Sequence, residues 1–364
     1  MNADELYDGI VALIPINVGE TDDYRNVIKI KLKNYVTLLN SLDKTCQPNK
    51  WSDVIKRVTQ LCDGINRAVD AEYRGIRHSA YESIKNQLDG YTTHKSVVTA
   101  LSCNILSVKT GMEAYRMRKV DIEDRRKLKS SDMFHIPLNK RGLVRTQRFS
   151  VIGYPCLYMS HSIYGCWEEM GRPDFGTVMV SKLVAQKDFN VLDLRVATKE
   201  QWDKDKVRCI KFFPLVIASM IQVKNDRDYY KPEYLIPQLL TEWVISRNRD
   251  KRDGKNQEII GIIYTSVQKN SDFDFPSDSY DNYAIPVLKP FSRSIYCDRL
   301  IEMFKITKPT YYDLELLKHN ETIDCGQYGL TSDEQKIENL RTSHFGKLEK
   351  FLKNCEVESI IQKK

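Results

Sequence analysis

The segment QRFSVIGYPCLYMSHSIYGCWEE, residues 147–169, decides the local fold and contains the most informative side chains of the chain. Its VIGYP part predicts a turn, because Gly and Pro favour tight turns, and CLYMS (156–160) alternates as a strand does. SIYGCWEEM (162–170) then predicts a helix with Ser162 as its N-cap. We therefore expect a turn, a strand and a helix in direct succession.

Three residues of this segment suit an anionic ligand that contains a ribose: Arg148, Tyr158 ten residues later and Glu169 eleven residues further. An Arg offers planar, permanently charged donors that bind a pyrophosphate in a bidentate manner, which a Lys cannot do. A Tyr offers an aromatic face and a hydroxyl. We expect Arg148 and Glu169 to approach one edge of the strand that carries Tyr158.

The same segment resembles the RES family, which is named for an Arg, a Glu and a Ser. The family pattern R-F/W-N/S-x-x-G-x-P-x-L-Y, followed by a Glu at the end of the next element, is matched here by Arg148, Phe149, Ser150, Gly153, Pro155, Leu157, Tyr158 and Glu169. The family's Ser lies in a later G-I-x-Y-x-S strand, matched by Gly261, Ile262, Tyr264 and Ser266. An entry strand with Tyr115, Arg116 and Arg118, and V-L-D-L at 191–194, complete the order. The resemblance covers roughly residues 110–290.

The resemblance implies a fold similar to that of ADP-ribosyltransferases and an enzyme that breaks the bond between nicotinamide and ribose in NAD. Cleavage of this bond passes through an oxocarbenium-like ribose, which a nearby carboxylate stabilises. Glu169 is predicted for that role, and its neighbour Glu168 is the alternative. No metal is expected at the site, and NAD is a substrate rather than a bound cofactor.

The binding roles also follow from the resemblance. Arg148 is the first choice for the pyrophosphate and Arg116 the second. Tyr158 is predicted to meet the nicotinamide ring or the ribose, and Ser266 to bind the ligand or to hold Glu169 in place. Because the interval from Glu169 to Ser266 is longer than in compact RES toxins, Ser160 and Ser162 are the alternatives to Ser266. Arg118, His135 and Lys140 are weaker candidates for the phosphate side, with a structural role expected for His135. Asn282 lies where the family often has a polar residue after its Ser.

The group that accepts ADP-ribose stays open between water and inorganic phosphate, since the shape of the pocket around the anomeric carbon selects it. One alternative is transfer of ADP-ribose to a protein or a nucleic acid. Another, from a different class, is a noncatalytic interaction protein that only binds a nucleotide. No helix-turn-helix antitoxin is fused to the chain, so an inhibitor would be a separate protein that covers the cleft.

Composition indicates a soluble, cytoplasmic protein of more than one compact unit. The chain has 364 residues, 41% of them hydrophobic and 29% charged, and exceeds the usual size of one hydrophobic core. We expect neither a signal peptide nor a membrane span, because no basic segment precedes a long apolar run. Nine cysteines without a C-x-x-C pair favour reduced thiols. The net charge of +7 is dispersed, so nucleic-acid binding is not expected.

Residues 1–106 show apolar residues at helical spacing and predict an all-α domain, with Thr21, Ser52 and Ser79 as expected N-caps. In RES proteins such an extension resembles the HEPN-type helical domain. Catalytic HEPN ribonucleases have an Arg and a His on one helix with four to six residues between them, whereas Arg74 and His78 have only three residues between them. A noncatalytic domain that mediates homo-oligomer formation is therefore expected.

From about residue 110 the apolar period shifts toward two, which predicts strands. The expected fold class is α+β: an N-terminal helical domain (1–106), an ADP-ribosyltransferase-like mixed α/β RES domain (107–310) and a C-terminal extension (311–364) that ends in a helix.

Overall fold

The computed structural model describes residues 1–92, 97–98, 101, 104–249, 258–268, 275–287, 295–311 and 332–361. It shows mixed α and β structure, as predicted, in two compact units. Unit 1 consists of residues 1–106, 145–152 and 192–259, and unit 2 of residues 107–144, 153–191 and 260–364. No helix of the described ranges is long and apolar enough to cross a membrane.

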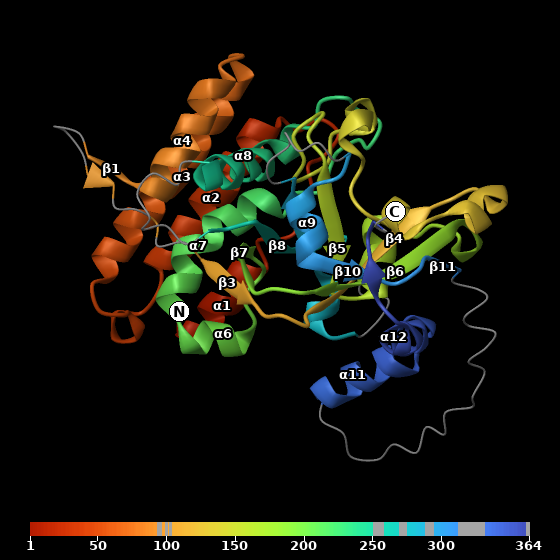
Figure 1. Ribbon diagram of the computed structural model, residues 1–364. Helices are drawn as coiled ribbons and strands as arrows, with labels where there is room; N and C mark the ends of the chain where they lie inside the picture. The colour runs from red at the N-terminus through yellow and green to blue at the C-terminus, as the bar shows by residue number, and fades with distance from the viewer. Residues whose placement is uncertain are drawn as a thin grey trace. The chain divides into compact units, whose positions relative to one another are not determined.

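Unit 1 is built from helices. They are α1 (Ala3–Val11), α2 (Tyr24–Asn40), α3 (Trp51–Tyr73), α4 (Arg77–Asp89), α6 (Lys199–Lys204), α7 (Lys206–Ser219) and α8 (Leu235–Arg249), with a short hairpin of β1 (Tyr91–Thr92) and β2 (Val97–Val98). Helix α3 forms the centre, because its apolar residues recur every three or four positions and bury one stripe. Helices α3 and α4 lie side by side (Figure 1), and Gly64 permits this approach, since a Cβ there would collide with Gln87.

The helical part of unit 1 extends beyond residues 1–106. Helix α7 packs against α2 and α3, and α8 packs against α3 and α4. Parts of the apolar surfaces of α2, α3 and α4 are thus covered within the same chain. Homo-oligomer formation through these helices stays a prediction. The expected N-caps also differ: Asp23 caps α2, and α3 and α4 begin at Trp51 and Arg77, before Ser52 and Ser79 can cap them.

Unit 2 is organised around a sheet with the order β12-β10-β6-β4-β5-β9-β8-β7-β3, and β11 also pairs with β6. The strands are β3 (Ile105–Val108), β4 (Glu113–Lys119), β5 (Cys156–Ser160), β6 (Val178–Ala185), β7 (Phe189–Leu194), β8 (Gly261–Thr265), β9 (Asp281–Pro286), β10 (Phe304–Ile306), β11 (Thr310–Tyr311) and β12 (Glu358–Ser359). The boundary between the units passes through β3 and β7. The predicted turn before β5 contains Gly153 at a φ of 74°, which favours glycine.

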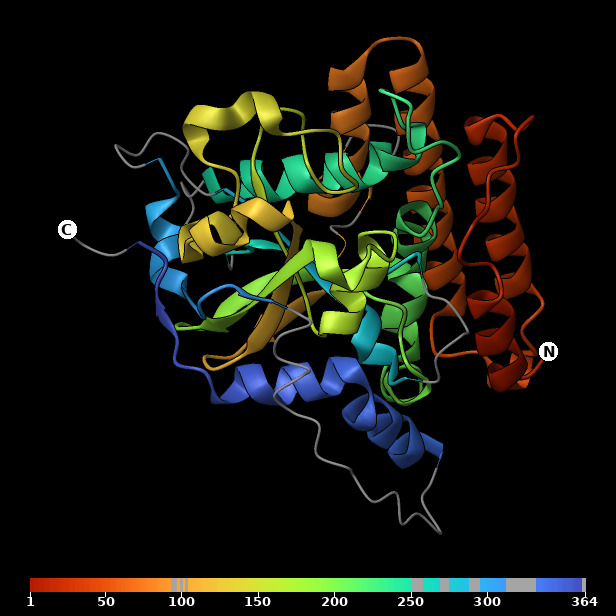
Figure 2. The same cartoon turned by 90° about the vertical axis from the view of Figure 1, so that its right-hand side faces the viewer.

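The helices of unit 2 are α5 (Ile163–Glu169), α9 (Asp298–Met303), α11 (Ser332–Thr342) and α12 (His344–Asn354). Ser162 caps α5 as predicted, since its hydroxyl accepts from the N–H of Gly165 at 2.8 Å. Helices α11 and α12 form a pair at the C-terminal end of the chain (Figures 1 and 2), and α12 packs on α5. The helix expected in the C-terminal extension is present as α11 and α12, and the short strand β12, which pairs with β10, follows it.

Helices α5 and α12 cover one face of the sheet with an aromatic core. The ring of Tyr164 meets those of Phe275, Tyr280 and Phe345 edge on, with centroids 4.9 to 5.4 Å apart. Such edge contacts add specific geometry to the burial of large apolar surfaces. The C-terminal helices thereby help to fix α5, the helix that ends at Glu169.

Candidate active site

The register of the sheet places several predicted residues on one face of unit 2. Tyr115 pairs with Ser160, Ser160 with Asn282, and Asn282 with Tyr264. Directly paired residues project from the same side of a sheet, and neighbours along a strand from opposite sides. We call this side, which α5 and α12 cover, the α5 face. Tyr158, two residues before Ser160, belongs to the same face and is half-buried.

The two adjacent carboxylates of α5 have different surroundings. Glu168 is 3% exposed and accepts hydrogen bonds from the Tyr164 hydroxyl at 2.5 Å and from Arg172 at 2.9 and 3.1 Å. Burial, followed by the bond to Glu168, raises the pKa of Tyr164, which keeps its proton for this contact. The carboxylate of Glu168 is therefore buried and bound to Tyr164 and Arg172 within the protein.

Glu169 is exposed and faces the sheet residue Asn282, whose Nδ2 donates to its Oε1 at 3.1 Å. Asn282 itself is buried at 3% exposure, so its amide is held by the surrounding strands. A surface carboxylate is ordinarily free to sample several rotamers, and this bond restricts that freedom. The arrangement presents a solvent-accessible carboxylate in a defined position at the edge of the α5 face.

Ser266 lies just beyond β8 and is fully buried. Its N–H donates to the carbonyl of Tyr280, and its hydroxyl accepts from the N–H of Gln268 at 3.0 Å. The hydrogen bond to Glu169, which was one of the predicted roles of Ser266, comes from Asn282 instead. Its role as a ligand-binding hydroxyl stays a prediction.

Arg116 follows Tyr115 in β4 and therefore projects from the opposite face. Its Nη1 donates to the backbone carbonyl of Tyr158 at 2.8 Å, and burial lowers the pKa of its guanidinium. Within the described residues its Nε is buried without a hydrogen-bond partner. Arg116 thus contacts the backbone of β5 from the side of the sheet opposite to the α5 face, and its role as a pyrophosphate ligand stays a prediction.

Arg148 belongs to unit 1. It is 8% exposed, and its Nη1 donates to the carbonyls of Ser219 and Ile221 at 2.9 and 2.8 Å. Its guanidinium also lies 5.0 Å from the ring centre of Tyr234. These contacts secure residues 145–152 to the C-terminal end of α7. The structure therefore gives Arg148 a structural role, and its contact with a pyrophosphate stays a prediction.

Most of the remaining candidates from the sequence also contact the protein backbone. His135 has the expected structural role: its Nε2 accepts from the N–H of Cys297 at 2.9 Å, and burial lowers its pKa to about 4, which keeps the ring neutral. Arg118 donates to the carbonyl of Asp132, whereas Lys140 is exposed. The hydroxyls of Ser160 and Ser162 donate to backbone carbonyls of residues 281 and 279.

Sequence reasoning did not identify Glu349 of α12. Its Oε1 accepts from the N–H of Ile163 at 2.8 Å, at the N-terminus of α5. Burial raises the pKa of this carboxyl group to about 7. No local pattern could have indicated this contact, because the two residues are 186 positions apart.

The chain is 32% identical over 322 residues to a protein of Bacillus subtilis (strain 168) named "Putative toxin YopC". The match covers 82% of this chain and 68% of that protein. No protein-family model matches the chain, and neither does any solved structure. The resemblance to the RES family accordingly stays a prediction from the quoted motifs.

Proposed function

This chain belongs to the family of the putative toxin YopC, and on that premise we propose that it is a toxin that cleaves NAD between nicotinamide and ribose. The observation that carries the proposal is the exposed carboxylate of Glu169, held by the buried amide of Asn282 beside the α5 face. The relative's name supports a toxin. The motifs shared with RES proteins support NAD as the target.

The proposed chemistry uses Glu169 as an electrostatic partner of the reacting sugar. As the bond to nicotinamide breaks, positive charge develops on the ribose, and a carboxylate in a fixed position stabilises it without further reorganisation. Asn282 supplies that fixed position, and Tyr158 on the same face offers a ring for nicotinamide or a hydroxyl for the ribose. Water or inorganic phosphate then accepts the ADP-ribosyl group at the anomeric carbon.

A toxin of this kind requires control in the cell that makes it. We propose a separate antitoxin protein that binds unit 2 over Glu169 and Tyr158, since access of NAD to these residues is what it must prevent. Copurification of such a protein with Glu169 buried in the complex would support this partner.

The test is incubation of the purified chain with NAD, with and without inorganic phosphate, followed by chromatographic separation of the products. Nicotinamide with ADP-ribose indicates hydrolysis, and nicotinamide with ADP-ribose phosphate indicates phosphorolysis. ADP-ribose attached to a protein or nucleic acid would instead identify a transferase. Absence of NAD consumption by the inhibitor-free protein would refute the enzymatic proposal.

Glu169→Gln should lower kcat by about 100-fold to 1000-fold while NAD binding is largely preserved, because the carboxylate acts mainly in the charged transition state. The matched control is Glu123→Gln, which removes an exposed carboxylate elsewhere in unit 2 and should leave kcat unchanged. Full activity of Glu169→Gln would exclude this residue as the stabilising carboxylate.

A further inference from the structure

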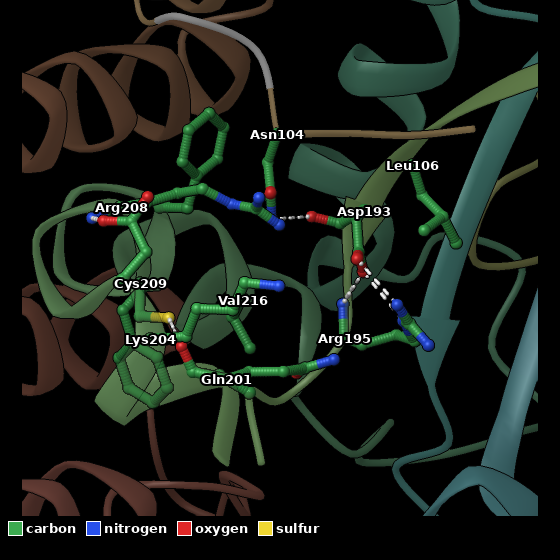
Figure 3. A pocket seen from close by; sticks show the side chains of 13 residues that line it. Asn104, Leu106, Asp193, Arg195, Gln201, Lys204, Arg208, Cys209 and Val216 are labelled. Atoms are coloured by element: carbon green, nitrogen blue, oxygen red, sulfur yellow. Dashed lines mark hydrogen bonds and ion pairs between the residues drawn. The ribbon is translucent and has the colours of Figure 1, made fainter. Parts of the chain in front are cut away.

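A separate cavity lies within unit 1, formed by the end of β7, the α6 to α7 turn and one face of α7. It encloses about 380 Å³, which is within the range of small-molecule sites, roughly 300 to 1,000 Å³. Figure 3 shows Asp193 and Arg195 on one side and Arg208 and Cys209 on the other. None of the residues proposed to act on NAD lines this cavity.

The acidic side chains of the cavity are already engaged. Asp193 accepts two hydrogen bonds from the guanidinium of Arg195, at 2.9 and 2.8 Å, so this pair is neutral overall. Asp205 is the N-cap of α7 and accepts from the N–H of Arg208 at 3.0 Å. The charge of Asp193 is thus balanced by Arg195, whereas Asp205 keeps its negative charge, because a backbone N–H is neutral. With three basic side chains (Arg195, Lys204 and Arg208) against two carboxylates, the lining retains one positive charge.

Two basic side chains remain at its edge. Lys204 and Arg208 are exposed, and within the described ranges neither has an ion pair. They flank the first turn of α7, a helix of 14 residues whose N-cap is Asp205. The edge of the cavity is accordingly cationic, and Arg208 can bind an anionic group in a bidentate manner.

The inner wall has the opposite character. Phe212, Phe213 and Val216 of α7 are buried and line the cavity, and Leu106 contributes from β3. A ligand that fills this space removes apolar surface from water, which favours binding. Water alone would gain few hydrogen bonds from such a wall. An apolar inner wall and a cationic edge together suit a ligand that has an apolar part and an anionic group.

We propose that this cavity binds a small organic anion with a flat apolar body, such as an aromatic carboxylate or an aromatic phosphate. The body lies against Phe212, Phe213 and Val216, and the anionic group meets Lys204 and Arg208. The proposal concerns unit 1 alone and does not depend on NAD cleavage.

The test uses naphthyl phosphate, naphthoate and uncharged naphthol as probes, with binding to the full-length chain followed by intrinsic probe fluorescence. At least one of the two anions should bind at one site per chain, tighter than naphthol by about tenfold or more. Preference between them identifies the anionic group. Affinity should fall at higher salt, because exposed charges are screened.

The double variant Lys204→Ala, Arg208→Ala should weaken the anions about tenfold or more, since charged hydrogen bonds are lost, and should leave naphthol unchanged. Arg227→Ala is the matched control, because Arg227 is an exposed arginine of unit 1 outside the cavity. Leu106→Trp, which fills part of the cavity, should weaken all three probes. Equal anion affinity in the double variant and the unmodified chain, or no saturable binding of either anion, would overturn the proposal.

Discussion

At the scale of single residues, Asn282 is the residue through which the sheet positions Glu169. Asn282→Ala should lower kcat about fivefold with little change in KM, because the lost hydrogen bond is worth about 1 kcal/mol. Asn282→Asp adds a second carboxylate, and a like charge raises the pKa of Glu169. Since Glu169 must be ionised to act, the acidic limb of the pH profile should move to higher pH. Asn139→Asp, an exposed change in unit 2, should leave that limb in place.

A variant of Arg148 can separate its structural role from the predicted ligand-binding role. Arg148→Lys retains the charge but cannot reproduce both hydrogen bonds to Ser219 and Ile221, so the free energy of unfolding should fall by about 1 to 3 kcal/mol. Denaturant unfolding and calorimetric NAD titration of the same variant separate the two roles. Unchanged stability with weaker NAD binding would contradict the structural role and restore the pyrophosphate prediction.

At the scale of elements, the contact between α12 and α5 should depend on pH through Glu349. Its pKa, raised by burial from 4.5 to about 7, means that the folded chain binds more protons than the unfolded chain between these values. The stability of this contact is therefore complete below about pH 4.5 and is lost as the pH rises through 7, by roughly 3 kcal/mol in total. Glu349→Gln should lack this decrease, and the exposed Glu356→Gln should retain it, in denaturant unfolding from pH 4.5 to 8. Parallel curves for Glu349→Gln and the unmodified chain would contradict this role.

At the scale of the whole chain, the compact units are discontinuous in sequence. Residues 1–106 expressed alone should not show a cooperative unfolding transition, because α7 and α8, which cover α2, α3 and α4, are missing. Circular dichroism during thermal unfolding checks this, with the full-length chain as the control. A cooperative transition of the fragment would show that the N-terminal helices form an independent domain. The fragment should also lack ribonuclease activity, since Arg74 is the C-cap of α3 and His78 lies in the first turn of α4, so the two do not share a helix.

Much of the local structure around the candidate site follows from the sequence. The turn with Gly153, strand β5 and helix α5 with its Ser162 cap are set by neighbours within a few residues, through turn preferences, alternation and capping. The strand that contains Tyr264 was recognised for the same reason. For the carboxylate that is proposed to stabilise the ribose, the sequence indicated two adjacent candidates, Glu168 and Glu169.

The tertiary structure decided what these residues contact. It engaged Glu168 with Tyr164 and Arg172, and paired Glu169 with Asn282, 113 positions away. It placed Arg116 behind the sheet, because the register between strands determines which side of an alternating strand faces a given helix. The position of Arg148 in unit 1 is also a tertiary property, because the carbonyl groups that it contacts belong to residues more than 70 positions later in the chain. Local preferences select elements, whereas the burial of polar groups requires partners that only the assembled fold brings together.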